Sequence, residues 1–154
     1  MAIALTLKQY LEDHDIDYEV MSHKKTGTSS LTAEASHIPG ECLAKGVILR
    51  RDGGYLMAIL PASRHVALAE VGHRLDQPVG LATEEEIATL FPDCEAGAVP
   101  GLAMAYGMEA MVDDSLDELK DVYIEGGDHR CLVHLEGRQF RKLTKDMPHA
   151  PISC

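Results

Sequence analysis

Residues 31–60 read LTAEASHIPGECLAKGVILRRDGGYLMAIL, a pattern that predicts a short helix followed by two apolar strands. The strands, Leu43–Leu49 and Tyr55–Leu60, flank an Asp52-Gly53-Gly54 turn, which is typical of a β-hairpin. Lys45 is the only charged residue in the first strand. A buried ammonium group is costly unless an anion contacts it. Lys45 therefore either extends from the strand end to solvent or meets a carboxylate or an anionic ligand.

The composition indicates one globular domain. Of the 154 residues, 45% are apolar and 25% charged, and with no Trp and two Phe the core must be mainly aliphatic. The first residues lack the pattern of a secretory signal, and no apolar run approaches the roughly 18 residues of a membrane span. We therefore expect a cytoplasmic protein with a single domain over residues 1–146 and a flexible tail over residues 147–154.

The spacing of cysteine and histidine indicates neither disulfides nor a metal site. No CxxC pair is present, and we expect reduced thiols at Cys42, Cys94, Cys131 and Cys154. No pair of Cys or His residues has the spacing usual for zinc ligands. We expect the protein to work without a metal ion or another cofactor.

Capping residues and apolar periodicity predict a mixed α and β chain around the hairpin. Thr83 and Glu86 form a capping-box pattern at the start of a helix that Pro92 should end, and Ser29 or Ser30 should cap the helix before the hairpin. Further helices are expected at residues 6–13, 63–75 and 138–145, and further strands at 18–21, 79–82, 108–112, 122–124 and 130–135. The chain shows no internal repeat and no linker.

The charge distribution limits the kinds of partner. A formal net charge of −11 argues against broad electrostatic binding of nucleic acid, and we expect no binding to DNA or to a membrane. Acidic residues crowd the segment 109–128. Cationic residues gather elsewhere, at Lys24, Lys25, Arg50, Arg51, Arg138, Arg141, Lys142 and Lys145. Charge runs are ordinarily solvated faces, but these cations are also the candidates for contacts with phosphate groups.

Three features could carry chemistry. The chain contains no Walker loop and no GxSxG, GxGxxG or HExxH motif, which leaves Lys45, the loop Gly97–Gly101 and the turn Gly126–His129. A loop with two glycines can bring backbone N–H groups close to a carbonyl or an oxyanion, and it could equally be an ordinary connection. His129 could bind a ligand at a pocket mouth or be an exposed turn residue.

In this order the features resemble one known family. The relevant residues are Thr32-Ala33-Glu34-Ala35, Ile38-Pro39-Gly40, Leu43-Ala44-Lys45, the Gly97–Gly101 loop and Glu125-Gly126-Gly127-Asp128-His129. They are similar to the YbaK family, whose members are aminoacyl-tRNA deacylases related to the editing domain inserted in bacterial prolyl-tRNA synthetases. The resemblance runs from about Leu7 to Leu143. It implies an α+β fold in which helices flank a mixed sheet that curls towards a barrel.

The resemblance also implies roles for individual residues. Lys45 matches the functional lysine that holds the 3′ end of the tRNA through its phosphate or terminal sugar, and Gly97 matches a glycine whose loop amides bind the ester carbonyl. Substrate-binding roles follow for Ala98, Val99 and Gly101 in the same loop and for His129, which matches a histidine that governs amino-acid choice. The family loop often reads Gly-x-x-x-Pro, whereas this chain has Pro100 followed by Gly101. This departure puts the shape of the loop in question.

Three functions are compatible with these residues. The first is a free-standing trans-editing hydrolase that removes a small, wrongly attached amino acid from tRNA, with the aminoacyl-tRNA 3′ end and an aminoacyl-tRNA synthetase as partners. In the second, Lys45 is a desolvated Schiff-base nucleophile. The third is a non-catalytic module that uses the same pocket to bind a nucleotide or a protein. The resemblance favours the first.

Overall fold

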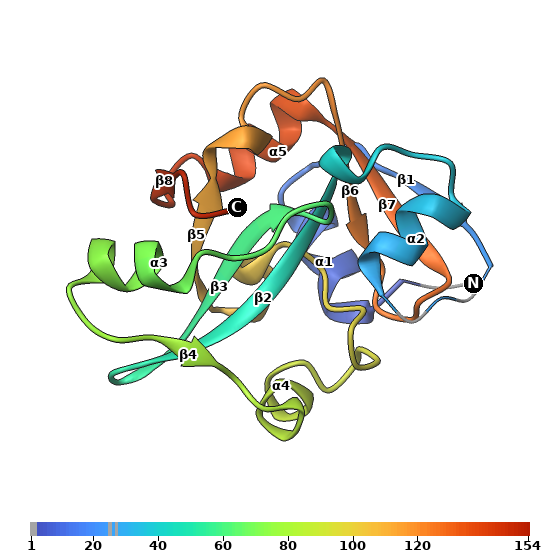
Figure 1. Cartoon of the computed structure of the whole chain (residues 1–154). Helices are drawn as coiled ribbons and strands as arrows, with labels where there is room; N and C mark the ends of the chain where they lie inside the picture. The colour runs from blue at the N-terminus through green and yellow to red at the C-terminus, as the bar shows by residue number, and fades with distance from the viewer. Residues whose placement is uncertain (1–2, 25, 27) are drawn as a thin grey trace.

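The computed structural model describes residues 3–24, 26 and 28–154. Their strands form one eight-stranded mixed sheet in the order β1-β7-β6-β2-β3-β5-β8, and β4 also pairs with β2 (Figure 1). The strands are β1 (Glu19–Ser22), β2 (Leu43–Arg51), β3 (Gly54–Pro61), β4 (Gly80–Leu81), β5 (Glu109–Asp113), β6 (Asp121–Glu125), β7 (Cys131–Glu136) and β8 (His149–Ala150). The helices are α1 (Leu5–Asp13), α2 (Ser29–Ala35), α3 (Leu68–Leu75), α4 (Glu84–Leu90) and α5 (Gly137–Thr144), with 3-10 turns η1 (Gly40–Cys42), η2 (Ala103–Tyr106) and η3 (Asp114–Leu116). The α+β fold expected from the sequence is confirmed.

The predicted hairpin forms the centre of the sheet. Its strands, β2 and β3, run antiparallel from the pair Ala44–Pro61 to the pair Arg51–Gly54. Gly53 in the turn has a φ of 82°, a conformation that glycine adopts without steric cost. Parallel neighbours then extend both edges, because β6 pairs with β2 and β5 pairs with β3.

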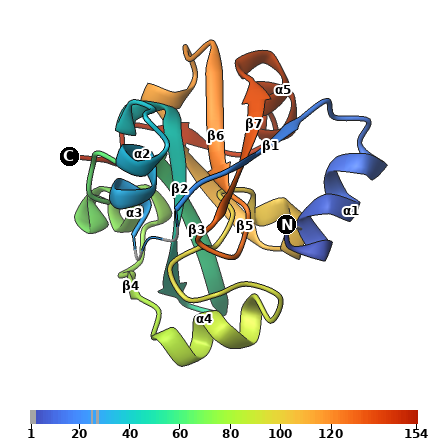
Figure 2. The ribbon, with the colours of Figure 1, turned by 90° about the vertical axis from the view of Figure 1, so that its right-hand side faces the viewer.

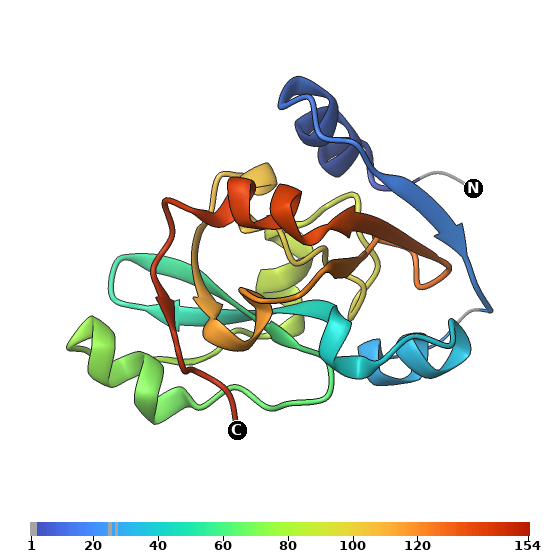
Figure 3. The same ribbon diagram turned by 90° about the horizontal axis from the view of Figure 1, so that it is seen from above.

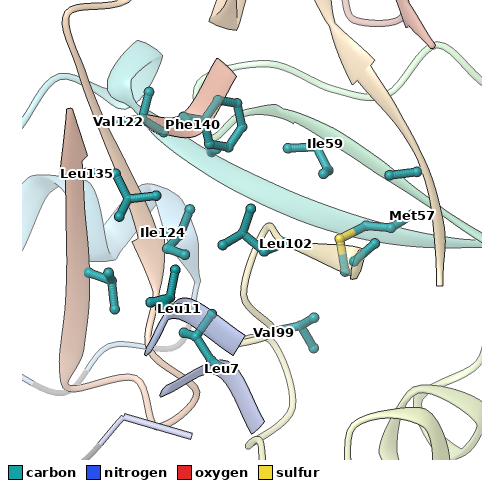
Figure 4. Close-up of a cluster of buried hydrophobic side chains, with 14 of the residues drawn as sticks. Leu7, Leu11, Met57, Ile59, Val99, Leu102, Val122, Ile124, Leu135 and Phe140 are labelled. Atoms are coloured by element: carbon teal, nitrogen blue, oxygen red, sulfur yellow. The ribbon is translucent and has the colours of Figure 1, made fainter. Parts of the chain in front are cut away.

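The sheet curves around one main core cluster. Alternate residues of β2, Ala44 and Ile48, face this cluster together with residues of β3, β5, β6 and β7. Leu7 and Leu11 of α1 and Phe140 of α5 close it from outside the sheet (Figure 4). Each fully buried aliphatic or aromatic side chain contributes about 1.5–3 kcal/mol relative to exposure, so this cluster holds the sheet in its curved form.

The opposite face of β2 carries the side chains that alternate with the core residues. Leu43 packs in a small cluster with Ala33 of α2, and Leu49 packs in another with Val71 of α3. The helices α1 and α5 therefore lie on one side of the sheet, and α2 and α3 lie on the other (Figure 3). Lys45 lies between Leu43 and Leu49 on this second face, at the gap between the two small clusters.

The helix α4 begins with the capping box predicted from the sequence. The Thr83 hydroxyl accepts a hydrogen bond from the Glu86 amide at 3.2 Å, and the Glu86 carboxylate accepts one from the Thr83 amide at 2.9 Å. The helix ends at Leu90, before Pro92. It lies at one end of the sheet, apart from the other helices, and it leads into the glycine loop (Figure 2).

Two predicted helix starts need correction. The segment 63–67 is not helical, and α3 begins only at Leu68. The reason is a tertiary contact that the local pattern does not contain, because His65 exchanges backbone hydrogen bonds with Cys154. Thr28, rather than Ser29 or Ser30, caps α2, since its hydroxyl accepts from the amide of Leu31.

The expected flexible tail is in fact part of the fold. The strand β8 pairs in parallel with β5, opposite Val112 and Asp113. Ile152 is fully buried, and its amide donates to the Asp113 carboxylate at 2.9 Å. The backbone bonds between Cys154 and His65 then attach the end of the chain to the segment before α3. Residues 147–154 therefore complete one edge of the sheet.

Candidate functional site

The candidate site lies where β6 ends beside β2. These strands pair in parallel over two positions, Leu43 with Tyr123 and Ala44 with Ile124. Paired residues on neighbouring strands point to the same face of a sheet, so Lys45 and Glu125, at the next position, both project towards the side covered by α2. Beyond this point the glycine loop, residues 95–101, lies along the edge of β2.

The glycine loop, residues 95–101, is attached on both sides. Its Pro100 forms an isolated antiparallel bridge with Lys45, and the amide of Glu95 donates to the carbonyl oxygen of Gly127 at 2.7 Å. The loop therefore joins β2 to the turn that follows β6. Gly97 has a φ of 82°, which places the loop in a left-handed conformation that disfavours any side chain.

Close approach to β2 explains the unusual end of this loop. A Cβ atom at Gly101 would lie 2.7 Å from the carbonyl oxygen of Ala44, which is too close for any residue other than glycine without movement of the backbone. A proline at this position would make the same clash. The structure thus accounts for the order Pro100-Gly101 by packing against the hairpin.

Ala98 and Val99, two of the predicted substrate-binding residues, direct their side chains inward. Ala98 is fully buried, and Val99 belongs to the main core cluster (Figure 4). The Ala98 amide donates to the carbonyl oxygen of Glu95 at 3.1 Å. A ligand at this loop would therefore contact its backbone, with the amides of Gly97 and Val99 on either side of the Ala98 amide.

Lys45 is half-buried, and the only acceptor it reaches among the described residues is a carbonyl. Its Nζ donates to the carbonyl oxygen of Ala62 at 3.5 Å, and it forms no ion pair with a carboxylate in that part of the chain. Burial lowers the pKa of the Lys45 ammonium. A desolvated ammonium with donors to spare is suited to an anionic or polar ligand.

His129 connects the turn after β6 to the glycine loop. The residue is 6% exposed, which rules out the alternative of an exposed turn histidine. Its ring Nε2–H donates a short hydrogen bond to the carbonyl oxygen of Ala96, and Nδ1 is buried without a partner in the described residues. Since a carbonyl only accepts, the proton on Nε2 is fixed by this contact. The predicted residues Lys45, Gly97 and His129 are thus brought together around one loop.

Glu125 was not among the predicted site residues. It is 1% exposed, and neither carboxyl oxygen has a hydrogen-bond partner of normal geometry within the described chain. Burial raises its pKa to about 7, the negative charge of Asp128 adds to the rise, and the Thr32 hydroxyl opposes it. The available signal was a carboxylate at the end of the apolar run Val122–Ile124, where a buried strand residue is expected.

A cavity of about 310 Å³ lies between α4 and the glycine loop. Its walls include Ile87, Phe91 and Val99, and Gly97 contributes to its edge. Burial raises the pKa of the Cys94 thiol in this wall to about 12, so this cysteine is no thiolate nucleophile. The site therefore combines an apolar cavity beside the loop with the polar side chains of Lys45 and Glu125.

The arginines of the predicted cationic patch contact other groups of the protein. Arg50 pairs with Glu86 at 3.1 Å and Arg51 with Glu109 at 2.9 Å, both towards the hairpin turn. Arg141 donates to backbone carbonyl oxygens near η3. Lys24 is exposed, and the predicted contribution of Lys25 lies outside the described residues. Lys24 lies between His23 and Thr26, whose amides donate to the carbonyl oxygens of Arg130 and His129, so Lys24 and Lys45 are both cations near the site.

Two further properties concern metals and membranes. Among residues 3–24, 26 and 28–154, no group of three or more His, Cys, Asp or Glu side chains could hold a metal ion. In the same residues, no helix has the length and apolar character required to cross a membrane. All four cysteines have free thiols.

The raised pKa of Glu125 predicts a specific dependence of stability on pH. The unfolded chain loses this proton near pH 4.5 and the folded protein only near pH 7. Glu125 therefore destabilises the fold progressively as the pH rises through this window, by about 3 kcal/mol at most. We expect Glu125→Gln to be more stable than the wild type at pH 8 and to lose this advantage at pH 4.5, as measured by urea denaturation. Glu34→Gln, a change of the same charge at an exposed residue of α2, is the control, and an advantage independent of pH would contradict the burial of an ionisable carboxyl.

Known structures share this architecture. A hypothetical protein matches with a TM-score of 0.85 and 20% identity over 97% of this chain and 99% of its own. A candidate trans-editing enzyme for prolyl-tRNA synthetase matches with a TM-score of 0.83 and 20% identity over 98% of this chain and 96% of its own. A candidate signal transduction protein from Marinobacter aquaeolei VT8 matches with a TM-score of 0.78 and 22% identity, over 97% of this chain and 30% of its own. At these identities the matches establish the fold.

The sequence itself matches a family model. No curated protein matches the chain, but the model of the aminoacyl-tRNA editing domain matches residues 23–143. That range contains Lys45, the glycine loop and His129, which are the features that first indicated the YbaK family. The chain belongs to the aminoacyl-tRNA editing domain family.

Proposed function

We propose that this protein is a free-standing trans-editing hydrolase of the cytoplasm that cleaves the ester of a tRNA mischarged with a small amino acid. The observation that carries the proposal is the convergence of Lys45, the glycine loop and the turn at His129 at the end of β6. Membership of the editing-domain family supports the reaction. The likeness in fold to a candidate trans-editing enzyme for prolyl-tRNA synthetase supports action on a released tRNA.

Each group has a distinct task in this proposal. The Lys45 ammonium binds the phosphate or terminal sugar at the 3′ end of the tRNA, because its burial leaves it poorly solvated. Backbone amides at Gly97 and Val99 donate to the ester carbonyl and stabilise the negative charge that develops there. His129 holds the loop through Ala96 and in this way shapes the space for the amino acid.

Water attacks the ester carbon, and the bond between that carbon and the esterified ribose oxygen breaks. The neighbouring free ribose hydroxyl relays the proton from the water to the leaving ribose oxygen. This assignment fits the side chains at the site. The thiol of Cys94, just before the loop, has a raised pKa, and Asp128 accepts hydrogen bonds from backbone amides of its own turn. The enzyme therefore contributes position and electrostatic stabilisation, and the substrate contributes an acid–base group.

A panel of mischarged tRNAs tests the proposed reaction directly. We expect hydrolysis of at least one tRNA that carries a small amino acid and no hydrolysis of a correctly charged tRNA with a large one. Failure to release any amino acid would leave the non-catalytic binding module as the better account. Trapping with borohydride and carbonyl compounds tests the other enzyme alternative, and an adduct at Lys45 would favour a Schiff-base mechanism.

Lys45→Ala should abolish deacylation while the protein stays folded. The lost charge-assisted contact costs about 1.5–3 kcal/mol or more, which lowers the rate at least ~10- to 100-fold. The fold should tolerate the change because Lys45 makes one long hydrogen bond to a carbonyl. Lys45→Arg should restore only part of the rate, since a planar guanidinium does not replace a compact ammonium. Lys8→Ala, at an exposed position of α1, is the control and should deacylate like the wild type. Near-normal turnover by Lys45→Ala would contradict the role assigned to Lys45.

Gly97→Val should disable the site through the loop backbone. A side chain at this left-handed position displaces the amides, and the loss of one oxyanion donor costs about 2.7–4 kcal/mol. Gly53→Val is a matched control, because Gly53 has the same φ of 82° and open space around it in the hairpin turn. Both variants carry similar backbone strain, but only Gly97→Val should lose deacylation. Equal rates for the two would assign the loop a structural role alone.

Binding of intact tRNA should depend only weakly on salt. Lys45 and the exposed Lys24 are available near the site, while Arg50 and Arg51 are paired with carboxylates. Contact with about two or three phosphates of a single-stranded 3′ end gives a slope of log affinity against log salt near −2. The affinity of tRNA and of a short 3′-end mimic, measured over a salt series, checks this. Recognition of a particular tRNA would then depend on the aminoacyl group or on a synthetase as partner. A slope near −6 would instead reveal a broad basic surface.

A further inference from the structure

Glu125 is an ionisable residue at the site that has no role in the proposed reaction. Both of its oxygens are buried without a hydrogen-bond partner of normal geometry in the described chain, on the sheet face that also carries Lys45. A buried carboxyl group without a partner is costly to the fold, so its presence beside a ligand site calls for a ligand that pairs with it. The substrate of the proposed reaction contains such a group, because every aminoacyl ester carries a free α-amino group.

We infer that Glu125 binds the α-ammonium group of the aminoacyl moiety, and that the protein thereby distinguishes a free aminoacyl ester from an N-blocked or hydroxyacyl ester. The inference rests on the proposed function and adds a specificity-determining residue to it. The groups around Glu125 suit this task. In an aminoacyl ester the carbonyl carbon joins the ribose oxygen to the α-carbon, and the α-carbon carries the amine. Lys45 on β2 is placed for the tRNA end, the glycine loop for the carbonyl, and Glu125 on β6 for the amine.

The other carboxylate of this turn is already occupied. Asp128 Oδ1 accepts hydrogen bonds from the amides of Arg130 and Cys131, each at 2.9 Å, and it thereby shapes the turn before β7. Glu125 precedes this turn at the end of β6, where pairing with Leu132 of β7 fixes its backbone on one side. A rigid strand position is better suited than a loop to place a carboxylate against one substrate atom.

Thr26 links α2 to the turn after β6. Its hydroxyl is hydrogen-bonded to that of Thr32 at 2.5 Å, and its amide donates to the carbonyl oxygen of His129 at 3.3 Å. Thr26 therefore lies against both neighbours of the site, Thr32 on α2 and His129 on the turn. An ammonium group bound here takes up the unpaired oxygens, so that the Glu125 carboxylate exchanges a buried environment for a charged partner.

The test compares two non-hydrolysable adenosine amides by calorimetry. One carries an aminoacyl group on a 3′-amino-3′-deoxyadenosine, and the other carries the matching 2-hydroxyacyl group, in which a hydroxyl replaces the ammonium. The amino acid is the one released fastest in the panel of mischarged tRNAs, or alanine if none is released. Wild type should bind the aminoacyl amide at least about tenfold more tightly, and Glu125→Gln should bind the two within about twofold.

Glu34→Gln, which removes the same charge from an exposed position of α2, should keep the tenfold preference. Equal binding of both amides by the wild type, binding of neither, or an unchanged preference in Glu125→Gln would each overturn the inference. The measurement is of binding and does not require catalysis. If the protein hydrolyses no mischarged tRNA but prefers the aminoacyl amide through Glu125, the proposed reaction is contradicted and this inference is supported. A protein that deacylates mischarged tRNA but binds both amides equally would support the proposed reaction and contradict this inference.

Discussion

The candidate site depends on one backbone arrangement along the edge of β2. The glycine loop contacts this edge directly after the point where β6 stops pairing with it. Two parallel pairs hold β6 against β2 as far as Ala44, and the bridge from Pro100 takes over at Lys45. The same loop is attached to the turn after β6 by Glu95 and His129. Strand end, loop and turn are therefore fixed relative to one another, which is the condition for a preorganised site.

This arrangement places opposite charges near each other without an ion pair. Lys45 and Glu125 project from adjacent strands to the same face, yet each meets mainly neutral surroundings, and burial shifts both pKa values towards the uncharged form. Apolar residues at both positions would suit the fold better, since uncompensated buried charges lower stability. We interpret the two residues as a cost to stability that serves ligand binding. The helix α2 covers this face and supplies the Thr32 hydroxyl beside Glu125.

The sequence predicted the parts of this protein whose causes are local. The β2–β3 hairpin follows from two apolar runs and a glycine turn, and the α4 capping box follows from Thr83 and Glu86. The family resemblance added the grouping of Lys45, Gly97 and His129 around one loop. Glu125 was missed because the apolar run before it indicates burial but does not indicate which groups of the fold it faces. Sheet register, which the local pattern does not contain, is what turns it towards Lys45.

The remaining differences also come from long-range contacts. The tail looked loose because it is short and rich in proline, but it is held by pairing with β5, a strand more than thirty residues earlier. Arg50 and Arg51 looked available for phosphates, but the fold places Glu86 and Glu109 beside them.

A crystal structure of the protein with a non-hydrolysable aminoacyl-adenosine amide tests the central claim most directly. The account predicts the amide carbonyl at the backbone of Gly97 and Val99, the ribose end towards Lys45 and the ammonium at Glu125. A ligand bound elsewhere, for example wholly within the cavity between α4 and the loop, would contradict it.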